Sequence, residues 1–411
     1  MDFNMNAITP SSGPVPTGRN QTIDILRGMA LVLILIVHCS FDFTGWDWTI
    51  PEEHVPELPM AALNPTVGGL VDFFLRDKAR ALFALMFGVS FALQLARSEQ
   101  SGRSFERMFI KRMVLLAMIG LVHGHLIYYF EILRLYAMAG LLMLLLWRLP
   151  NKALLPLVGF LTVLAPIVGY GLLQALGLDF MAGRPPQSEI FVAFTSDSPR
   201  EILSINHRLA TSTYLPGFLI GFGMPILGNF LLGLWLARKG WLQDPMVHRK
   251  ALKRLMVVGL VFGLLLQSSS LIMPQLDPAS PVWLFLLLGI AFLAAAPMLM
   301  LGYVGTITLL CTHPLWIRVL RWLAPAGRMT LTHYIMQSVF AWVIFYGVGL
   351  GLYGRIGPAL AVPIGLLLAT FQVLLSIWWL KRYRSGPLEW LWRWAIEGLR
   401  PQWRRESHSA P

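Results

Sequence analysis

The chain has 411 residues, of which 56% are hydrophobic and only 13% are charged, and its mean hydropathy is +0.62. This composition excludes an ordinary soluble domain and is typical of a polytopic membrane protein. The formal net charge of +12 points to nucleic acid only if the basic residues gather on a soluble surface. Two cysteines, Cys39 and Cys311, are too few for a disulfide framework.

Apolar runs predict an all-α fold of about ten transmembrane helices. The polar residues 1–20 precede them, without the features of a cleaved signal peptide, and we expect a disordered tail there. The predicted helices lie near 24–42, 70–96, 110–129, 132–147, 152–176, 213–237, 251–272, 282–311, 329–350 and 358–381. The eighth is long enough to be tilted or broken around Gly302 and Gly305.

The basic residues fall on one side of this topology. With the N-terminus in the cytoplasm, the inner segments carry most of the 33 Lys and Arg residues. The outer segments carry most of the acids, including Asp42, Glu52, Glu53 and Glu57. The positive-inside rule therefore predicts that both termini are cytoplasmic. Topology explains the basic charge, so we expect the lipid bilayer and no nucleic acid as a partner.

This topology places two regions after the tail of residues 1–20. Residues 21–381 form the membrane domain, with long outer loops at 43–69 and 177–212 that are rich in Pro, Asn, Ser and Thr. Loops of this length are often lids or binding loops. Residues 382–411 interleave Trp with Arg, as expected of an amphipathic segment at the cytoplasmic interface.

Arg27 and His38 are the most informative residues of the first span. They are eleven positions apart, so on a helix they share one face about 16 Å apart. Ionisable groups within a span are costly and are therefore functional candidates. The structural alternative is that Arg27 anchors the helix end and His38 bonds a neighbouring helix. Asp42, one turn after His38, either orients the imidazole as general-base catalysis requires or simply begins the outer loop.

Further charged residues and histidines lie at the same outer level. Arg76 and Arg80 are one turn apart and are candidates for an anion clamp. His123 and His125 diverge by about 200° on a helix, so we expect no metal site from this pair. The candidates for contacting substrate or an oxyanion are Arg76, Arg80, His123, Glu131, Arg134, His333 and Gln337. The alternative for the outer set is a ring of interface charges.

The ninth predicted span has a candidate phosphate-binding residue at its cytoplasmic end. Arg328 lies at its inner mouth, and a guanidinium group matches the geometry of a phosphate. His333 and Gln337 follow one turn apart within the span. For His333, a hydrogen-bonded core histidine is the favoured interpretation.

Several motifs together resemble the DUF418 family of bacterial membrane proteins. They are Ile23–Gly28, Arg80–Gly88, Gly120–His123, Ile132–Ala137, Gly327–Ser338 and Gly386–Arg393. That family is similar to transmembrane acyltransferases, including the acyltransferase-3 proteins and the lysosomal enzyme that acetylates heparan glucosamine. In acyltransferase-3 proteins an arginine, ten residues and a histidine occupy the first span, and Arg27 to His38 fits this spacing. Many DUF418 members look to have Asn in place of His38 and His333. The histidine at position 38 of this chain therefore supports a catalytic role for that residue here.

The resemblance implies transfer of an acyl group, usually acetyl from acetyl-CoA, to a sugar or another hydroxyl or amine acceptor at the bacterial inner membrane. Under this hypothesis Arg27, Arg328 and Arg384 hold the phosphates of acyl-CoA. His38 acts as the general base or itself accepts the acyl group, with Asp42 orienting it.

Two other classes of function stay open at this point. A transporter or exporter without chemistry would use the same buried polar residues to line a path, with His38 relaying protons. A non-catalytic binding or scaffold subunit would use the two long outer loops. A homo-oligomer is compatible with any of the three.

Overall fold

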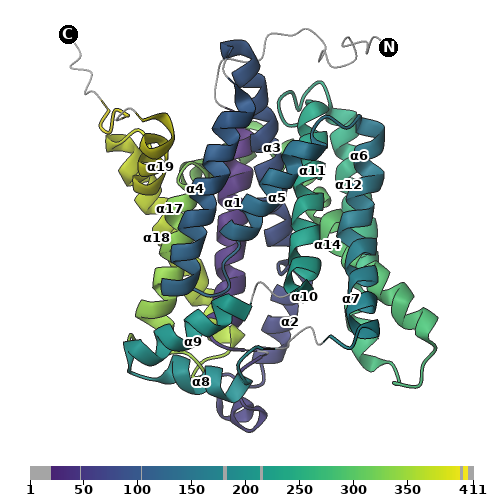
Figure 1. The fold of residues 1–411 in the computed structure, drawn as a ribbon, viewed down its shortest axis with the longest axis vertical. Helices are drawn as coiled ribbons and strands as arrows, with labels where there is room; N and C mark the ends of the chain where they lie inside the picture. The colour runs from purple at the N-terminus through teal and green to yellow at the C-terminus, as the bar shows by residue number, and fades with distance from the viewer. Residues whose placement is uncertain are drawn as a thin grey trace.

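The computed structural model describes residues 20–46, 48–102, 104–178, 183–212, 216–398 and 401–405. Within these ranges the chain is helical, apart from turns and one isolated bridge between Tyr383 and Arg404. Long helices run side by side in one bundle (Figure 1). The chain is thus an all-α polytopic membrane protein, as predicted. Of the expected disordered tail, only Asn20 lies within the described residues.

The predicted spans are confirmed in number and position. Eight helical segments are long and apolar enough to cross a membrane, and two shorter apolar ones bring the total in the described ranges to ten. The eight are α1 (Gln21–Val37) with η2 (His38–Asp42), α2 (Asn64–Phe74) with α3 (Lys78–Ser101), α4 (Phe105–Leu126), α6 (Asn151–Gly159) with η4 (Phe160–Leu164) and α7 (Ala165–Ala175), η5 (Leu219–Gly223) with α11 (Met224–Arg238), α12 (Arg249–Gln267) with α13 (Ser269–Ile272) and η6 (Met273–Gln275), α14 (Val282–Leu310), and α18 (Pro358–Arg382). The shorter two are α5 (Leu133–Leu146) and α17 (Thr330–Phe340) with η8 (Ala341–Phe345).

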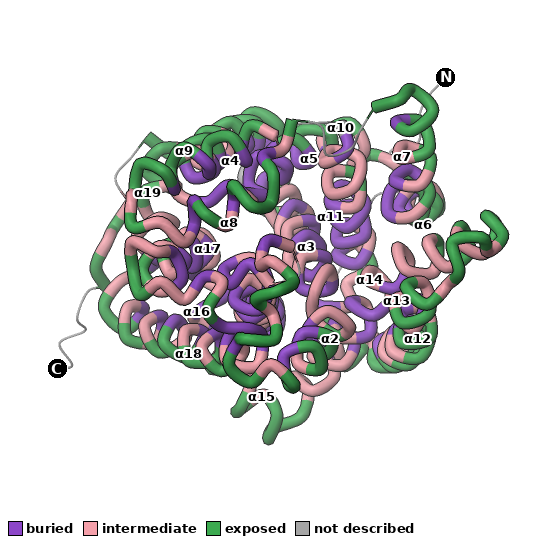
Figure 2. Tube along the Cα trace, turned by 90° about the horizontal axis from the view of Figure 1, so that it is seen from below, coloured by how far each residue is buried: buried purple, intermediate pink, exposed green. Residues whose placement is uncertain are grey.

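Helix α1 is the central column of one half of the bundle. It packs against α3, α17 and α18, and its start packs against α16 (Ala324–Gly327). Its core side chains are fully enclosed, with Ile25, Leu26 and Leu35 each 0% exposed. The view along the bundle shows buried positions of α3 and α11 inside and exposed positions around the rim (Figure 2).

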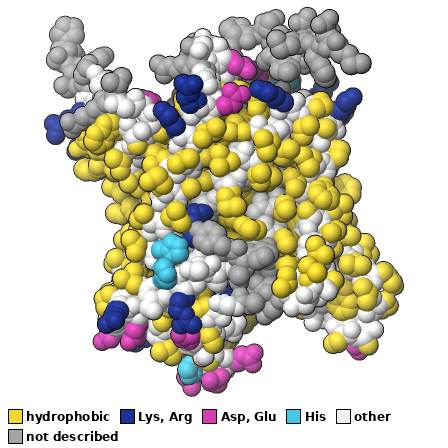
Figure 3. Space-filling view, in the orientation of Figure 1, with side chains coloured by type: hydrophobic (Ala, Val, Ile, Leu, Met, Phe, Trp, Pro, Cys, Tyr) yellow, Lys and Arg dark blue, Asp and Glu magenta, His cyan; other side chains and the backbone are white. Residues whose placement is uncertain are grey.

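Lys and Arg side chains gather at the end where α1 begins and α18 ends (Figures 1 and 3). We call it the basic end; its exposed members include Arg97, Arg107, Lys111, Lys381 and Arg382. The opposite end carries the exposed acids Glu52, Glu53 and Glu57. The positive-inside rule predicts that the basic end faces the cytoplasm.

The two long segments at the opposite end are largely helical. Residues 43–69 contain η3 (Glu52–Glu57) and the start of α2, and residues 177–212 contain α8 (Gln187–Thr195) and α9 (Pro199–Ser212). Helix α9 packs on α4, where Asn206 donates its amide to the carbonyls of Gly124 and His125 at 2.9 and 3.1 Å. Helices α8 and α9 are therefore packed on the bundle and do not form an open loop. We call these two helices the helical cover.

The segment after Lys381 is fixed to the bundle by contacts with α17 and α4. On α19 (Pro387–Glu397), Glu389 accepts hydrogen bonds from the backbone N–H groups of Leu331 and Thr332 at 2.7 and 3.0 Å. These contacts cap the N-terminus of α17, whose first N–H groups have no partner within the helix. Burial raises the pKa of the Glu389 carboxyl, although its hydrogen bonds oppose that shift. That α19 lies on the membrane surface stays a prediction.

Helix α14 is continuous from Val282 to Leu310, so of the two alternatives for the eighth span, tilted or broken, the break around Gly302 and Gly305 is not present. Those glycines let α14 and α12 approach backbone to backbone: a Cβ on Gly302 would lie 2.7 Å from the backbone nitrogen of Leu260. A Cβ on Gly305 would lie 2.8 Å from the nitrogen of Met256. Small residues at such crossings are a usual basis of helix packing in membranes.

Gly302→Ala should therefore destabilise the protein, because the added methyl group forces α12 and α14 apart. Overpacking of this kind costs about 1–3 kcal/mol, which we expect as a lower melting temperature in detergent. Gly289→Ala is the matched control on the same helix, because a Cβ there meets nothing within 4 Å. Equal melting temperatures for the two variants would contradict this account of the helix crossing.

Candidate functional site

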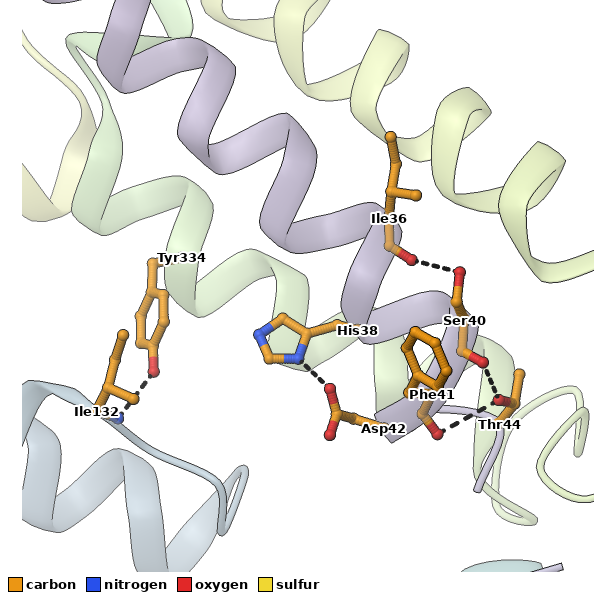
Figure 4. Close-up of polar contacts among 8 residues, drawn as sticks. All are labelled: Ile36, His38, Ser40, Phe41, Asp42, Thr44, Ile132 and Tyr334. Atoms are coloured by element: carbon orange, nitrogen blue, oxygen red, sulfur yellow. Dashed lines mark hydrogen bonds and ion pairs between the residues drawn. The ribbon is translucent and has the colours of Figure 1, made fainter. Parts of the chain in front are cut away.

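The end of the first span holds a histidine–aspartate pair. Helix α1 widens into the π-helical turn η2, and within it Nδ1 of His38 lies 2.8 Å from Oδ2 of Asp42 (Figure 4). The side chains are 14% and 18% exposed, so both are shielded but reachable. An ionised carboxylate only accepts, so Nδ1 carries the proton of this hydrogen bond, and in the neutral imidazole Nε2 then has a lone pair. Nε2 has no hydrogen-bond partner among the described residues.

Aromatic side chains pack against the histidine of this pair. The ring of His38 stacks on Phe43 with centroids 5.3 Å apart and meets the edge of Tyr128 at 5.7 Å. The buried hydroxyl of Tyr128 has no hydrogen-bond partner among the described residues. The imidazole is thereby held in place by packing as well as by Asp42, which limits its rotation.

A buried ion pair lies at the start of α5, between Glu131 of the preceding connection and Arg134 of the helix. Nε of Arg134 is 3.0 Å from Oε2 of Glu131, and the two side chains are 5% and 0% exposed. Two glycines of α4 make room for the guanidinium: a Cβ on Gly120 would lie 2.8 Å from Cγ of Arg134, and one on Gly124 would lie 2.9 Å from its terminal nitrogen. The motif around His123 therefore serves partly to seat Arg134.

His123 links α4 to α17. Its Nε2 lies 2.9 Å from the hydroxyl of Ser338, and its ring centroid is 5.4 Å from that of Tyr334. The hydroxyl of Tyr334 accepts a hydrogen bond from the backbone N–H of Ile132 at 3.2 Å, close to the His38 pair (Figure 4). The structure thus brings the first, third, fourth and ninth spans together around His38.

His333 and Gln337 belong to a separate buried network. Nε2 of His333 bonds the hydroxyl of Ser376, and Gln337 donates to the carbonyl of Leu31 at 3.1 Å. Gln372 accepts from Gln337 at 3.3 Å and donates to the carbonyl of His333 at 3.2 Å. These bonds tie α17 to α18 and α1, which favours a structural role for both residues.

The second span is broken where its charges lie. Helix α2 ends at Phe74 and α3 begins at Lys78, and between them Asp77 has a φ of 53° in the left-handed region. Non-glycine residues with such a φ are strained and cluster at functional sites. The hydroxyl of Tyr303 on α14 donates to the carbonyl of Phe74 at 2.9 Å, which satisfies one backbone group freed by the break.

Because of this break, Arg76 and Arg80 do not share one helical face. Arg76 pairs with Asp72 at 3.2 Å and stacks over Phe41. Arg80 pairs with Asp77 at 2.6 Å and stacks over the ring of Phe222. The geometry expected for a joint anion clamp is therefore not present.

Arg80 and Asp77 instead line a cavity of about 60 Å³ between α3, η4, α11 and α14. The other polar residues that line it are Thr162 and Asn229, and none of the lining residues comes from α1. Oδ1 of Asn229 is buried without a partner among the described residues. This space is separate from the His38 pair.

At the basic end, a cavity of about 420 Å³ lies beside the start of α1. It is lined by Gln21, Asp24, Arg321, Trp322, Ala324, Pro325, Arg328 and Ile377. Arg328 also donates to the backbone carbonyl of Arg384 at 3.5 Å. Arg27 is not among the lining residues, because its guanidinium bonds Asp24 at 3.3 Å and the hydroxyl of Ser90 on α3 at 2.5 Å.

Two residues of interest were missed from the sequence. Arg321 shares the basic-end cavity with Arg328, and the seven-residue spacing between them was the available signal. His125 was considered only beside His123, whereas the structure places it against His207 of α9. Within the described residues, no group of three or more His, Cys, Asp or Glu side chains is placed to hold a metal ion.

The fold and the site define a polytopic membrane protein that carries a shielded histidine–aspartate pair at one end of its first span. Residues 236–398 match the model of the family described as protein of unknown function (DUF418), and residues 19–194 match that of the heparan-alpha-glucosaminide N-acetyltransferase catalytic domain. The second match includes His38, Asp42, His123 and the Glu131–Arg134 pair.

Full-length relatives agree with the first match. Protein YxaH of Bacillus subtilis (strain 168) is 31% identical over 401 residues, which cover 92% of this chain and 95% of the relative. Protein YeiB of Escherichia coli (strain K12) is 30% identical over 402 residues, or 91% and 95%. A 39.9 kDa protein of the amylase 3′ region of Bacillus acidopullulyticus is 27% identical over 375 residues, or 91% and 93%. The chain belongs to the DUF418 family, as its motifs predicted.

Removing one partner of the buried ion pair should be strongly destabilising. Glu131→Gln leaves the Arg134 guanidinium buried without its counter-charge, which costs about 3–5 kcal/mol. The double variant with Arg134→Met removes both charges and should recover much of that loss. Melting temperatures of the two variants in detergent test this, and a double variant less stable than the single one would contradict it.

Proposed function

We propose that the protein is an acyltransferase of the bacterial inner membrane. It moves an acyl group, acetyl in the first instance, from cytoplasmic acyl-CoA to a hydroxyl or amine acceptor such as a sugar. The observation that carries the proposal is the 2.8 Å contact between His38 and Asp42. It lies in the segment that matches the N-acetyltransferase catalytic domain.

The proposed chemistry follows from the state of the imidazole. Asp42 holds the proton on Nδ1, so the lone pair on Nε2 takes the proton of the acceptor as its oxygen or nitrogen attacks the thioester carbonyl. The tetrahedral intermediate then expels CoA as a thiolate, which receives the same proton from Nε2. The hydroxyl of Tyr128 and Nδ1 of His123, both without a hydrogen-bond partner among the described residues, are the proposed groups for stabilising the oxyanion.

The basic-end cavity is the proposed site for the phosphates of CoA. Its volume of about 420 Å³ is within the range of ligand pockets, and Arg321 and Arg328 match phosphate geometry. The negative charge of Asp24 in its wall is compensated by Arg27. From Gln21 to His38 the path is roughly 25 Å along α1, so only an extended arm such as pantetheine would bring the thioester to the histidine.

Acetyl-CoA should stabilise the purified protein in a concentration-dependent way, because a ligand that binds only the folded state raises its melting temperature. Arg328→Ala and Arg321→Ala should each weaken this effect about tenfold or more. Arg355→Ala, an exposed arginine at the opposite end, is the matched control. Absence of any shift with acetyl-CoA, longer acyl-CoAs or free CoA, in folded protein, would contradict the proposal.

His38→Gln should abolish transfer of labelled acetyl from acetyl-CoA in membrane vesicles while leaving acetyl-CoA binding intact. Asp42→Asn should lower the rate by roughly 10²–10⁴-fold, because the ring loses its orientation and basicity. His54→Gln changes an exposed histidine of the outer segment 43–69 and should have no effect on transfer. Retained transfer in His38→Gln would exclude His38 as the base.

One observation favours a transporter as the second candidate function. Discontinuous spans with polar cavities beside them are typical of secondary transporters, and the break at Asp77 borders the cavity of Arg80 and Asn229. Substrate movement across vesicles without any affinity for acyl-CoA would favour this function over acyl transfer.

A further inference from the structure

Two histidines from distant parts of the sequence meet at the opposite end of the bundle. His125 ends α4 and His207 lies on α9, and their Nδ1 atoms are 3.2 Å apart with ring centroids 4.8 Å apart. Unlike His123, which is buried against Ser338, this pair is in contact with solvent. Histidine side chains are visible on this face beside the end of α4 (Figure 3).

The separation of the two nitrogens suits a shared metal ion. Zinc–imidazole bonds are about 2.0–2.1 Å long, so two nitrogens on a tetrahedral Zn²⁺ lie roughly 3.3 Å apart. A neutral pair also forms an N–H···N hydrogen bond at the observed distance, and that is the competing explanation. The two explanations differ in whether the pair captures a metal from solution.

The surroundings fix the backbone that carries the two histidines. Asn206, next to His207, donates its amide to the carbonyls of Gly124 and His125, which fixes the backbone of α9 against the end of α4. The adjacent cation Arg208 is paired with Glu189 of α8. A preorganised pair of ligands loses little conformational freedom on binding, which favours capture of an ion.

We propose that His125 and His207 bind a divalent transition metal of the Zn²⁺ class through their Nδ1 atoms, with water completing the coordination. The ion would clip α9 to α4. Helix α9 is packed against α8, whose Phe194 stacks on Tyr129 and Tyr346 in the aromatic cluster next to His38. The metal would therefore strengthen the docking of the helical cover over that part of the protein.

The test is a Zn²⁺ titration of the full chain in detergent, purified with a tag that contains no histidine and read by competition with a chromogenic chelator. We expect one saturable ion per chain, and at least tenfold weaker binding in His125→Gln and in His207→Gln. His54→Gln is the control for an exposed histidine. Cys311→Ser is the control for metal binding by a cysteine, because Cys311 is not buried whereas Cys39 is. Both controls should bind as the native chain does.

A second measurement keeps the inference testable if a glutamine variant folds poorly. His207→Cys keeps a zinc ligand at the same position and should retain binding. Hydrogen exchange should also show that Zn²⁺ slows exchange of α9 in the native chain and not in His125→Gln. No saturable binding by the native chain, or equal binding by all variants, would overturn the proposal and leave a hydrogen-bonded pair.

Discussion

A backbone-to-backbone contact between α1 and residues 323–327, which include α16, fixes the geometry on which both ends of the site depend. A Cβ on Gly28 would lie 2.1 Å from the carbonyl oxygen of Leu323, and one on Gly327 would lie 1.9 Å from that of Asp24. The contact sets Arg328 beside the start of α1 and forms one wall of the basic-end cavity. Because α1 is a continuous helix, its rotation at this crossing also decides where His38 points.

The bilayer imposes a second constraint, because polar groups within it must find partners in the protein. Most do so here: Arg134 has Glu131, Gln337 has the carbonyl of Leu31, and His333 has Ser376. His38 is different because its side chain is 14% exposed, so its unengaged Nε2 can be reached, whereas the unpartnered Nδ1 atoms of His123 and His333 are buried. A polar residue with one atom fixed and one left for a ligand is what separates a candidate for chemistry from a residue that only joins helices.

Sequence reasoning located the spans because apolar length is a local property, and it located the His38–Asp42 pair because four residues on a helix make one turn. It could not find Ser90 as the partner of Arg27 or His207 as the partner of His125, which are set by helix packing. It also missed two features of the backbone. The charged stretch at Asp77 gave no sign of a left-handed residue, and the glycines near 302 left a tilt and a break as alternatives, whereas they serve close packing of a continuous helix.

The π-helical turn from His38 to Asp42 has a consequence for comparing this chain with its relatives. Such a turn holds one residue more than an α-helical turn would in the same place, so it is equivalent to a one-residue insertion at the end of the span. Relatives with a regular helix there would need a one-residue gap after the histidine position. The Arg27–His38 spacing lies before the turn and would be unaffected. A rigid alignment through this point would displace Asp42 and hide an equivalent carboxylate in those relatives.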